Sequence, residues 1–205
     1  MIDRDYIESV LAKFEGKAIA RGYIPCQQGT YYGTGPSKGE PLGASGVTIA
    51  TGVDLGQQTA QGLKAMGVSA ETLAILEPYI GLKKQDAIRK LQESPLQLTE
   101  MQVELIDRAV HSRYVIQAAS LFGAELFGAA PKEAQAVAVS LHYQFGTPMR
   151  KESPALEQAW QCLRRGEYKG ASYLRCIDLW GKPHQAYMAR RRAEAAILDQ
   201  IQEGA

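Results

Sequence analysis

Apolar residues recur at helical spacing at the start of the chain. The recurring positions are Ile2, Tyr6, Val10, Leu11 and Phe14. Spacings of three and four residues are typical of the buried face of an α-helix. Asp3 or Asp5 can cap the first turn, and the pattern stops before Gly16. We therefore predict a short amphipathic helix over residues 3–14.

The next stretch, from about Gly22 to Gly46, is dense in glycine and proline. These residues are Pro25, Gly29, Gly33, Gly35, Pro36, Gly39, Pro41 and Gly43. Such density favours turns, so we expect a long irregular loop, and loops of this length in compact domains are often functional.

Residues 45–56 then carry a β-branched run between glycines, which predicts a strand or a small hairpin.

After Gly56 the apolar pattern is helical to the end of the chain. We predict helices near 58–66, 70–77, 83–92, 99–121, 131–145, 154–164, 167–178 and 183–202. Thr99 and Gln102 have the spacing of a capping box. Gly166 and Gly181 lie at expected helix ends.

The order of these elements predicts an α+β fold that is mostly helical. We expect a single domain, 1–205, with two lobes. The small lobe, about 15–70, contains the hairpin. The larger helical lobe covers about 71–205, with the N-terminal helix 3–14 packed on it.

Composition and charge fit an ordinary globular protein. Hydrophobic residues make up 45% of the chain and charged residues 22%, which argues against a disordered chain. The apolar runs are too short for a membrane span. The formal net charge of +1 gives no strong attraction to nucleic acid or to a membrane surface.

The three cysteines, Cys26, Cys162 and Cys176, are an odd and sparse set that argues against a disulfide framework. We expect reduced thiols made in a cytosol, with Cys162 and Cys176 as buried structural residues. The N-terminus has no basic stretch leading into an apolar core, so we expect no secretory signal. A substrate outside the cytoplasm would require another route.

Three side chains are candidates for acid–base chemistry: Glu15, Thr48 and Asp54. Glu15 ends the predicted first helix, where the negative end of the helix dipole and partial burial both favour the protonated acid. A general acid needs that form. Thr48 and Asp54 are an even number of residues apart, so on an extended strand both side chains would face the same side. Thr51 is an odd number of residues from each and would point to the other side.

Two carboxylates and a hydroxyl suit the hydrolysis of a glycosidic bond. One carboxylic acid protonates the leaving oxygen, and the other carboxylate positions a water on the opposite face of the sugar. The hydroxyl can hold the same water. The same spacing also fits a solvated glutamate and a turn-forming aspartate, so spacing alone leaves both interpretations open.

The segments KFEG, residues 13–16, and SGVTIATGVDLGQ, residues 45–57, resemble the catalytic lobe of the pesticin family of bacteriocin muramidases. That family is similar in fold to the lysozyme of T-even phages, so the resemblance implies a phage-lysozyme-like fold. It also implies Glu15 as the acid, with Thr48 and Asp54 completing the site. The order Glu, Thr, Asp is that of pesticin, since in the phage enzyme the Asp precedes the Thr.

The helical part carries the resemblance further. AVAVSLHYQFG, residues 136–146, resembles the core helix of the family, and YMARRRAEAAIL, residues 187–198, resembles its closing helix. We recognise no family motif over 57–98. The resemblance implies that the arginines of the closing helix mainly hold the lobes together.

Four residues are candidates for binding the glycan. Tyr31 and Tyr32 lie in the glycine-rich loop, where exposed aromatic rings can stack on sugars. Tyr143 and Gln144, at the end of helix 131–145, can reach the cleft floor and contact sugar hydroxyls. Ordinary packing is an equally good interpretation of Tyr143.

Other conspicuous residues have structural interpretations. We expect Trp160 and Trp180 in the core, and the run 190–192 as a solvated face in which Arg190 pairs with Glu194. His142 is expected to be a packed or hydrogen-bonded helix residue.

Two function classes are excluded by their missing motifs. The histidines, His111, His142 and His184, are scattered without ligand spacing, so we expect no metal. The chain has no glycine-rich loop with the lysine of a phosphate cradle, which argues against nucleotide binding. We expect no cofactor.

We therefore predict an N-acetylmuramidase that cleaves the β-1,4 bond between N-acetylmuramic acid and N-acetylglucosamine. Inversion is expected by analogy, with the two carboxyls about 6.5–9.5 Å apart. A non-catalytic wall-binding domain of the same fold and a lytic transglycosylase are the alternatives.

The expected partners are peptidoglycan strands, with an immunity protein if the chain is an effector. We expect a monomer that binds no nucleic acid and has no membrane span. It would be made in the cytoplasm without a signal peptide. It would act in the periplasm, either as a phage endolysin after holin release or as an antibacterial effector delivered by a secretion system.

Overall fold

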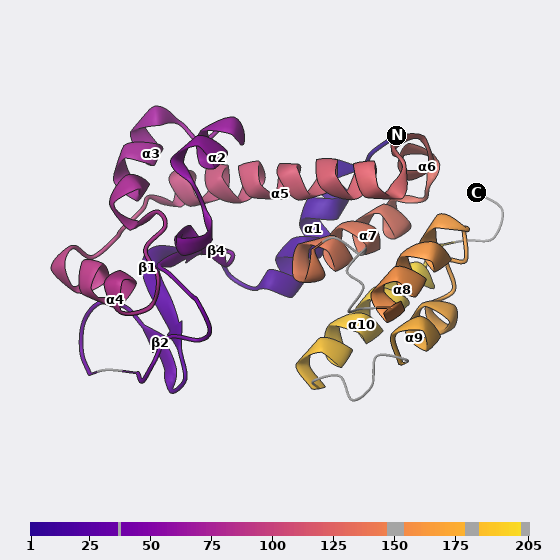
Figure 1. Ribbon diagram of the computed structural model, residues 1–205. Helices are drawn as coiled ribbons and strands as arrows, with labels where there is room; N and C mark the ends of the chain where they lie inside the picture. Colours follow the sequence, from indigo (N-terminus) through magenta and orange to yellow (C-terminus); the bar gives the residue numbers. More distant parts are fainter. Residues whose placement is uncertain (37, 147–153, 179–184, 202–205) are drawn as a thin grey trace. The chain divides into compact units, whose positions relative to one another are not determined.

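The computed structural model of the protein describes residues 1–36, 38–146, 154–178 and 185–201. These residues form one small sheet and a larger set of helices (Figure 1), which confirms the predicted α+β, mostly helical class. The strands are β1 (Ile19–Cys26), β2 (Gly29–Tyr31), β3 (Thr48–Ala50) and β4 (Val53–Asp54). The α-helices are α1 (Arg4–Glu15), α2 (Ala60–Ala65), α3 (Ala70–Leu76), α4 (Lys84–Glu93), α5 (Glu100–Phe122), α6 (Ala124–Ala129), α7 (Lys132–Phe145), α8 (Pro154–Arg164), α9 (Gly170–Asp178) and α10 (Gln185–Leu198). Two short 3-10 helices are η1 (Leu55–Gln57) and η2 (Glu77–Tyr79).

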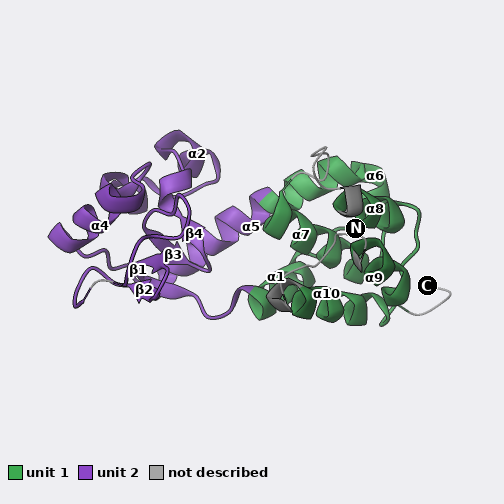
Figure 2. Cartoon of the chain, turned by 60° about the horizontal axis from the view of Figure 1, so that its bottom comes forward, with its two compact units in different colours: residues 1–14, 114–205 green, residues 15–113 purple. Residues whose placement is uncertain are grey.

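The chain divides into two compact units. Unit 1 comprises residues 1–14 and 114–205, and unit 2 comprises residues 15–113 (Figure 2). This boundary differs from the one expected near residue 70. The segment after α4 is tied to the sheet by backbone hydrogen bonds, from Gly22 N to Leu96 O at 2.9 Å and from Leu98 N to Ala20 O at 2.8 Å. The helices between the hairpin and α5 therefore belong to the unit of the sheet.

The sheet of unit 2 is antiparallel, with strand order β2-β1-β3-β4. Tyr23 of β1 faces Thr48 of β3, and Thr48 in turn faces Asp54 of β4. Because directly opposed residues in an antiparallel sheet project to the same face, this register brings side chains from three strands together.

The irregular loop expected from about Gly22 to Gly46 is a wrong prediction over its first part. β1 and β2 form a hairpin there, with Ile24 opposite Tyr31. Glycine density was misleading because Gly22 serves close packing rather than a turn. A Cβ at this position would lie 2.8 Å from the Leu96 Cβ, so only glycine lets the strand approach so closely.

Unit 1 has its own hydrophobic core. α1 contributes Ile7, Val10 and Leu11, which are almost fully buried with apolar residues of α5, α7 and α8. The ring of Trp160 is 1% exposed and packs on Phe122 with ring centroids 6.0 Å apart. The core position predicted for Trp160 is therefore confirmed.

The predicted helices agree with the observed ones to within a few residues, because their signals are local. Asp3 caps α1 by accepting the Tyr6 amide at 3.0 Å. The Thr99 and Gln102 capping box is confirmed by reciprocal bonds of 2.9 and 3.2 Å. The short helix α6 was not predicted.

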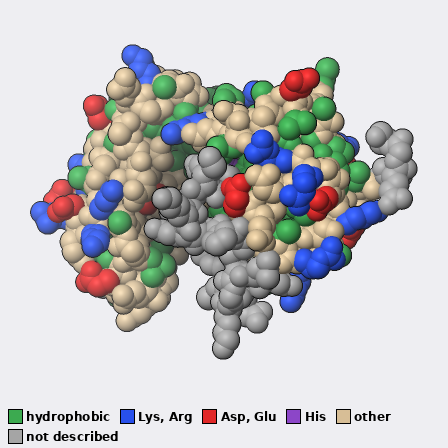
Figure 3. Space-filling model, turned by 45° about the vertical axis from the view of Figure 1, so that its right-hand side comes forward, with side chains coloured by type: hydrophobic (Ala, Val, Ile, Leu, Met, Phe, Trp, Pro, Cys, Tyr) green, Lys and Arg blue, Asp and Glu red, His purple; other side chains and the backbone are tan. Residues whose placement is uncertain are grey.

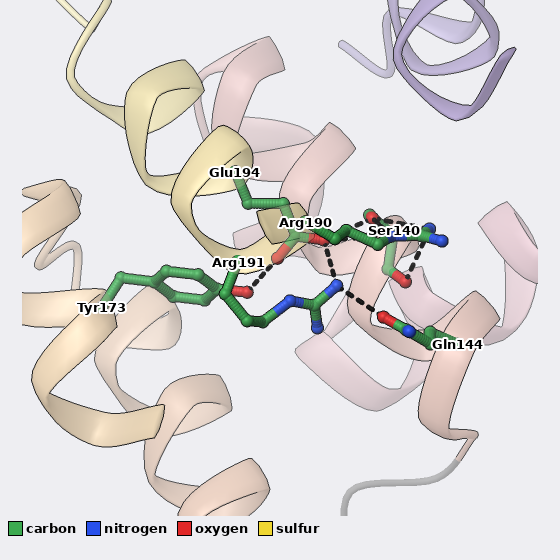
Figure 4. A network of polar contacts seen from close by, with 6 residues as sticks. All are labelled: Ser140, Gln144, Tyr173, Arg190, Arg191 and Glu194. Atoms are coloured by element: carbon green, nitrogen blue, oxygen red, sulfur yellow. Dashed lines mark hydrogen bonds and ion pairs between the residues drawn. The ribbon is translucent and has the colours of Figure 1, made fainter. Parts of the chain in front are cut away.

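A buried polar network links three helices of unit 1 (Figure 4). Its members are Ser140 and Gln144 of α7, Tyr173 of α9, and Arg190, Arg191 and Glu194 of α10. Arg191 Nη2 donates to Glu194 Oε1 at 2.6 Å and to Gln144 Oε1 at 2.8 Å. The Tyr173 hydroxyl donates to Glu194 Oε2. Burial raises the pKa of the Glu194 carboxyl, and the Arg191 charge opposes that rise.

The prediction that residues 190–192 form a solvated face is wrong at its centre. Arg191 is 1% exposed and Glu194 is fully buried. The expected pair of Arg190 with Glu194 is confirmed at 3.6 Å. Sequence spacing identified the pair but not its burial, because burial depends on the helices that pack on α10.

Three residues named in the sequence analysis lie outside the described part of the chain: Trp180, Gly181 and His184.

Among the helices that are described, none combines the length and the apolar character needed to cross a bilayer. Charged side chains of both signs are interspersed on the face drawn in Figure 3, in keeping with the formal net charge of +1.

Replacing the buried carboxylate of this network should strongly destabilise the protein. Glu194→Ala leaves the Arg191 charge buried without its partner, so we expect a loss of about 3–5 kcal/mol in the free energy of unfolding, measured by urea denaturation. Glu104→Ala is the control, because its ion pair with Arg108 is about two-thirds exposed and should change stability by less than about 1 kcal/mol. Equal effects of the two variants would contradict this account.

Candidate active site

The structure brings Thr48 and Asp54 together as direct partners across the β3–β4 hairpin. The prediction that they share one face is therefore confirmed, although the reason differs from a single regular strand. The chain reverses after Ile49, where the Gly52 amide donates to the Ile49 carbonyl at 3.1 Å. Ala50 and Gly52 have positive φ of 53° and 99°, and they form the turn that pairs the two side chains.

Two backbone amides hold the Asp54 carboxylate. Its Oδ1 accepts from Gly56 N at 2.8 Å and from Gly46 N at 3.0 Å. Asp54 thereby caps η1 and ties the segment before β3 to the segment after β4. Hydrogen bonds to a charged acceptor stabilise by about 1.5–3 kcal/mol each, so the carboxylate has one strongly preferred orientation.

Glycine is required at both donor positions because the two backbones almost touch. A Cβ at Gly46 would lie 2.4 Å from Leu82 O and 2.6 Å from Gly56 Cα. A Cβ at Gly56 would lie 2.7 Å from Leu82 O and 3.0 Å from Asp54 Oδ1. The two glycines therefore allow both amides to reach one oxygen.

Thr48 is 4% exposed, and its hydroxyl donates to the Gly46 carbonyl at 3.4 Å. Tyr23, its partner on β1, extends the row of side chains. Burial raises the pKa of the Tyr23 hydroxyl, with further contributions from Tyr32, from Asp54 and from Asp107. Tyr23 is thus partly buried and lies within the electrostatic reach of two carboxylates, those of Asp54 and Asp107.

Thr51 anchors the tip of the hairpin to α5. Asp107 Oδ1 accepts from the Thr51 amide at 3.1 Å and from its hydroxyl at 2.7 Å. The Thr51 hydroxyl also lies 3.4 Å from His111 Nε2. Thr51 therefore points toward α5. It lies in the turn and not on a regular strand, so its bonds to Asp107 set this direction and strand parity does not apply.

Glu15 is the last residue of α1 and the first of unit 2. It is half-buried, and Gly16 behind it has a positive φ of 78°, which ends the helix. Only three residues separate Glu15 from Ile19, whose partner on β3 is Ala50. Four residues of extended chain span at most about 14 Å, so Glu15 lies within that distance of Ile19, at the end of β1 that pairs with Ala50.

The predicted exposed position of Tyr31 is wrong. Tyr31 lies on β2 and is 4% exposed, because β1 and β2 pair where a loop was expected. Its side chain lines a cavity of 300 Å³ together with residues of α4, among them Gln85 and Gln92. Tyr32 is half-buried, and its ring lies 6.1 Å from that of Tyr23 and 5.3 Å from the Arg21 guanidinium.

Tyr143 and Gln144 belong to unit 1, where both have partners. The Tyr143 ring lies 4.6 Å from that of Tyr114, and Gln144 accepts from Arg191. His142 is buried, with Nε2 3.2 Å from Gln117 Oε1, and burial lowers the pKa of its ring. The hydrogen-bonded helix position predicted for His142 is confirmed.

Sequence reasoning missed Tyr23, Asp107 and His111. Tyr23 was missed because its strand was taken as loop. Asp107 and His111 are four residues apart in a correctly predicted helix, a spacing that places two side chains on one face. That polar pair was the available signal, but nothing local indicated that its partner is Thr51.

The arrangement in unit 2 fits acid–base chemistry. An oriented carboxylate and a neighbouring hydroxyl can hold a water between them, and a second carboxyl lies at the end of α1. Among the described residues, no group of three or more His, Cys, Asp or Glu could hold a metal ion.

Comparison with known families gives a match over most of the chain. The family model described as "Pesticin: Bacterial toxin homologue of phage lysozyme, C-term" matches residues 1–169. The match includes all of unit 2 with Glu15, Thr48 and Asp54, and it confirms the resemblance seen in the sequence. No curated protein matches the chain.

Filling the contact between the two glycines should disrupt the hairpin. Gly46→Ala places a Cβ against backbone that cannot move aside easily, so we expect a loss of about 1–3 kcal/mol in the free energy of unfolding, measured in urea. Gly128→Ala is the control, because nothing lies within 4 Å of its Cβ and alanine favours the α6 helix by about 0.5–1 kcal/mol. Unchanged stability of Gly46→Ala would contradict the close approach.

Removing the carboxylate that anchors Thr51 should loosen the hairpin tip. For Asp107→Ala we expect the Thr51 amide to exchange its hydrogen about 10- to 100-fold faster, since it loses a charged acceptor. Amide exchange followed by NMR measures this. Asp86→Ala, which removes an exposed carboxylate paired with Arg89, serves as the control. Unaltered exchange at Thr51 in Asp107→Ala would exclude the anchor.

Proposed function

Because the chain belongs to the pesticin family, a family of phage-lysozyme homologues, we propose that it is an N-acetylmuramidase. In this proposal it hydrolyses the β-1,4 bond between N-acetylmuramic acid and N-acetylglucosamine in peptidoglycan. The lysozyme-like family makes peptidoglycan the substrate class. The residues of unit 2 support the muramidase reaction within that class.

The observation that carries the proposal is the fixed carboxylate of Asp54 beside the hydroxyl of Thr48. Both amide hydrogen bonds go to Oδ1, so the other oxygen, Oδ2, is the one that a water molecule would contact. Thr48, the direct cross-strand partner, holds the same water through its hydroxyl. A carboxylate oriented in advance loses little entropy when it binds the water and takes up its proton.

Glu15 is the proposed general acid. It stands at the end of α1, joined to β1 by a short connection. In the reaction it donates its proton to the glycosidic oxygen as the bond to the anomeric carbon breaks. Asp54 accepts the proton of the attacking water, so one turnover passes one proton to the leaving sugar and takes one from water.

Water held by Asp54 and Thr48 attacks from the face opposite the leaving group, so the reaction inverts the anomeric carbon. Inverting enzymes keep their two carboxyls about 6.5–9.5 Å apart, and retaining enzymes about 5–5.5 Å. We propose the inverting arrangement, with Tyr32 available beside Tyr23 as an aromatic surface for a sugar ring.

The proposed place of action is the cell wall in the periplasm. A protein made in the cytoplasm reaches it as a phage endolysin after holin release or as an antibacterial effector through a secretion system. An effector requires an immunity protein in the producing cell. Neighbouring genes distinguish the two routes, since a holin gene indicates an endolysin and an inhibitor gene indicates an effector.

Substitution of the acid tests the function. Glu15→Gln cannot donate the proton, so we expect a loss of about 100- to 10,000-fold in the rate at which purified peptidoglycan is solubilised. Glu93→Gln is the matched control, because Glu93 also ends a helix of unit 2, and it should keep full activity. Asp54→Asn should lose at least about 100-fold, and Thr48→Val about 10- to 100-fold.

The alternatives give different results in the same assay. No solubilisation by the unmodified protein would indicate a wall-binding domain, and full activity of Glu15→Gln would remove Glu15 from its role. Mass spectrometry of the released fragments distinguishes the bond chemistry. Hydrolysis gives reducing N-acetylmuramic acid ends, whereas 1,6-anhydro ends would indicate a lytic transglycosylase.

A further inference from the structure

Two of the three cysteines lie on neighbouring helices of unit 1. Cys162 lies on α8 and is 1% exposed, and Cys176 lies on α9 and is half-buried. Both thiols line one small cavity between these two packed helices. A disulfide needs the two Cα atoms within about 7 Å of each other, a separation available to residues that line one cavity between packed helices.

The thiol pair is open to a reagent from solution. Both cysteines line a cavity of 180 Å³, together with Gln158, Glu167, Ser172 and Arg175. Gln158, Glu167 and Arg175 are exposed, so the cavity reaches the surface. Arg165, 2.6 Å from Glu167, adds a second cation at this rim. The Glu167 carboxylate offsets one of the two arginines, which leaves one net positive charge to favour the approach of an anionic disulfide such as oxidised glutathione.

The third cysteine is set apart from this pair. Cys26 belongs to unit 2, on β1, and is 5% exposed. Its thiol donates to the Ile24 carbonyl at 3.5 Å. Cys26 therefore lies in a different unit from Cys162 and Cys176, which line one cavity. The number of cysteines in the sequence does not reveal this grouping.

We propose that Cys162 and Cys176 form an intramolecular disulfide when the folded protein meets a small-molecule disulfide oxidant, and that this bond links α8 to α9. In reducing surroundings the pair stays as two thiols, and in an oxidising compartment it closes. The proposal concerns unit 1 alone and does not depend on the proposed muramidase activity.

The reaction balances with glutathione disulfide as the oxidant. Cys176, the more exposed thiol, loses its proton and attacks one sulfur of the oxidant, releasing one glutathione thiolate that takes up a proton. Cys162 then loses its proton and attacks the Cys176 sulfur of the mixed disulfide, which releases the second glutathione. The two cysteine sulfurs are oxidised, and two electrons pass to the oxidant, which leaves as two molecules of glutathione.

The second step should be the slower one. Burial raises the pKa of the Cys162 thiol to about 12, and the hydrogen bond to Glu167 Oε2 at 3.1 Å and the neighbouring Cys176 act in the same direction. The attacking species is the thiolate, and its fraction rises about tenfold per pH unit below the pKa. Closure is therefore expected to be faster at pH 9 than at pH 7, with the glutathione adduct of Cys176 accumulating at the lower pH.

Closure should also stabilise unit 1. The bond encloses the chain between Cys162 and Cys176, a loop for which chain entropy predicts a gain equivalent to a rise of about 5–10 °C in the melting temperature. Calorimetry of the oxidised and the reduced protein measures this shift, and the reduced protein should return to the lower value when a dithiol is added.

The decisive experiment treats the folded, full-length protein with oxidised glutathione and maps its peptides without reduction. We expect the loss of two hydrogen atoms from the intact mass and one cross-linked peptide pair, joining Cys162 to Cys176. Cys26→Ser is the matched control and should close like the unmodified protein. Cys162→Ser should stop at a glutathione adduct on Cys176.

Three results would overturn the proposal. One is the absence of any cross-link at pH 9, another is glutathione adducts that never resolve, and the third is a cross-link that involves Cys26. The same treatment in concentrated urea gives the pairing of the unfolded chain, in which all three cysteines should react. A folded protein that shows the same mixture of pairs as the unfolded chain would also contradict the proposal.

Discussion

The Asp54 carboxylate, held by the amides of Gly46 and Gly56, is the interaction on which the rest of the site depends. Both amides donate to the same oxygen. This is possible only because both residues are glycines, whose backbones approach each other more closely than a Cβ would allow. These two hydrogen bonds fix the ends of the β3–β4 hairpin and therefore the position of Thr48. The contact of Thr51 with Asp107 fixes the tip. A hairpin of only a few residues becomes a rigid support for the Thr48 and Asp54 pair.

Much of the helical structure could be predicted because its signals are local. The capping box of Thr99 and the apolar periodicity around it determine where α5 begins and ends without reference to other parts of the chain. β1 was missed because Gly22 and Pro25 resemble turn residues, whereas Gly22 in fact meets Leu96. That contact joins segments over 70 residues apart. Arg191 was misplaced for a similar reason, since its burial depends on α7 and α9.

The candidate site was predicted in part and for a partly different reason. Thr48 and Asp54 share a face because they are opposed across a turn, not because they alternate along one strand. The pair was accessible from the sequence, but the amides that orient Asp54 and the anchor at Asp107 were not. The adjacency of Cys162 and Cys176 is likewise a tertiary feature. In each case the sequence contains the reactive groups, and the packing decides which of them meet.

The central claim is that Asp54 and Thr48 direct a water to the face opposite the leaving sugar. Proton NMR of the product in the first moments of cleavage tests it most directly, because the anomeric configuration is read before mutarotation. A soluble peptidoglycan fragment is the substrate, and the new reducing end of N-acetylmuramic acid is the signal. The account predicts that the α-anomer forms first. Initial formation of the β-anomer would show retention, and with it a covalent intermediate that contradicts the proposed role of the bound water.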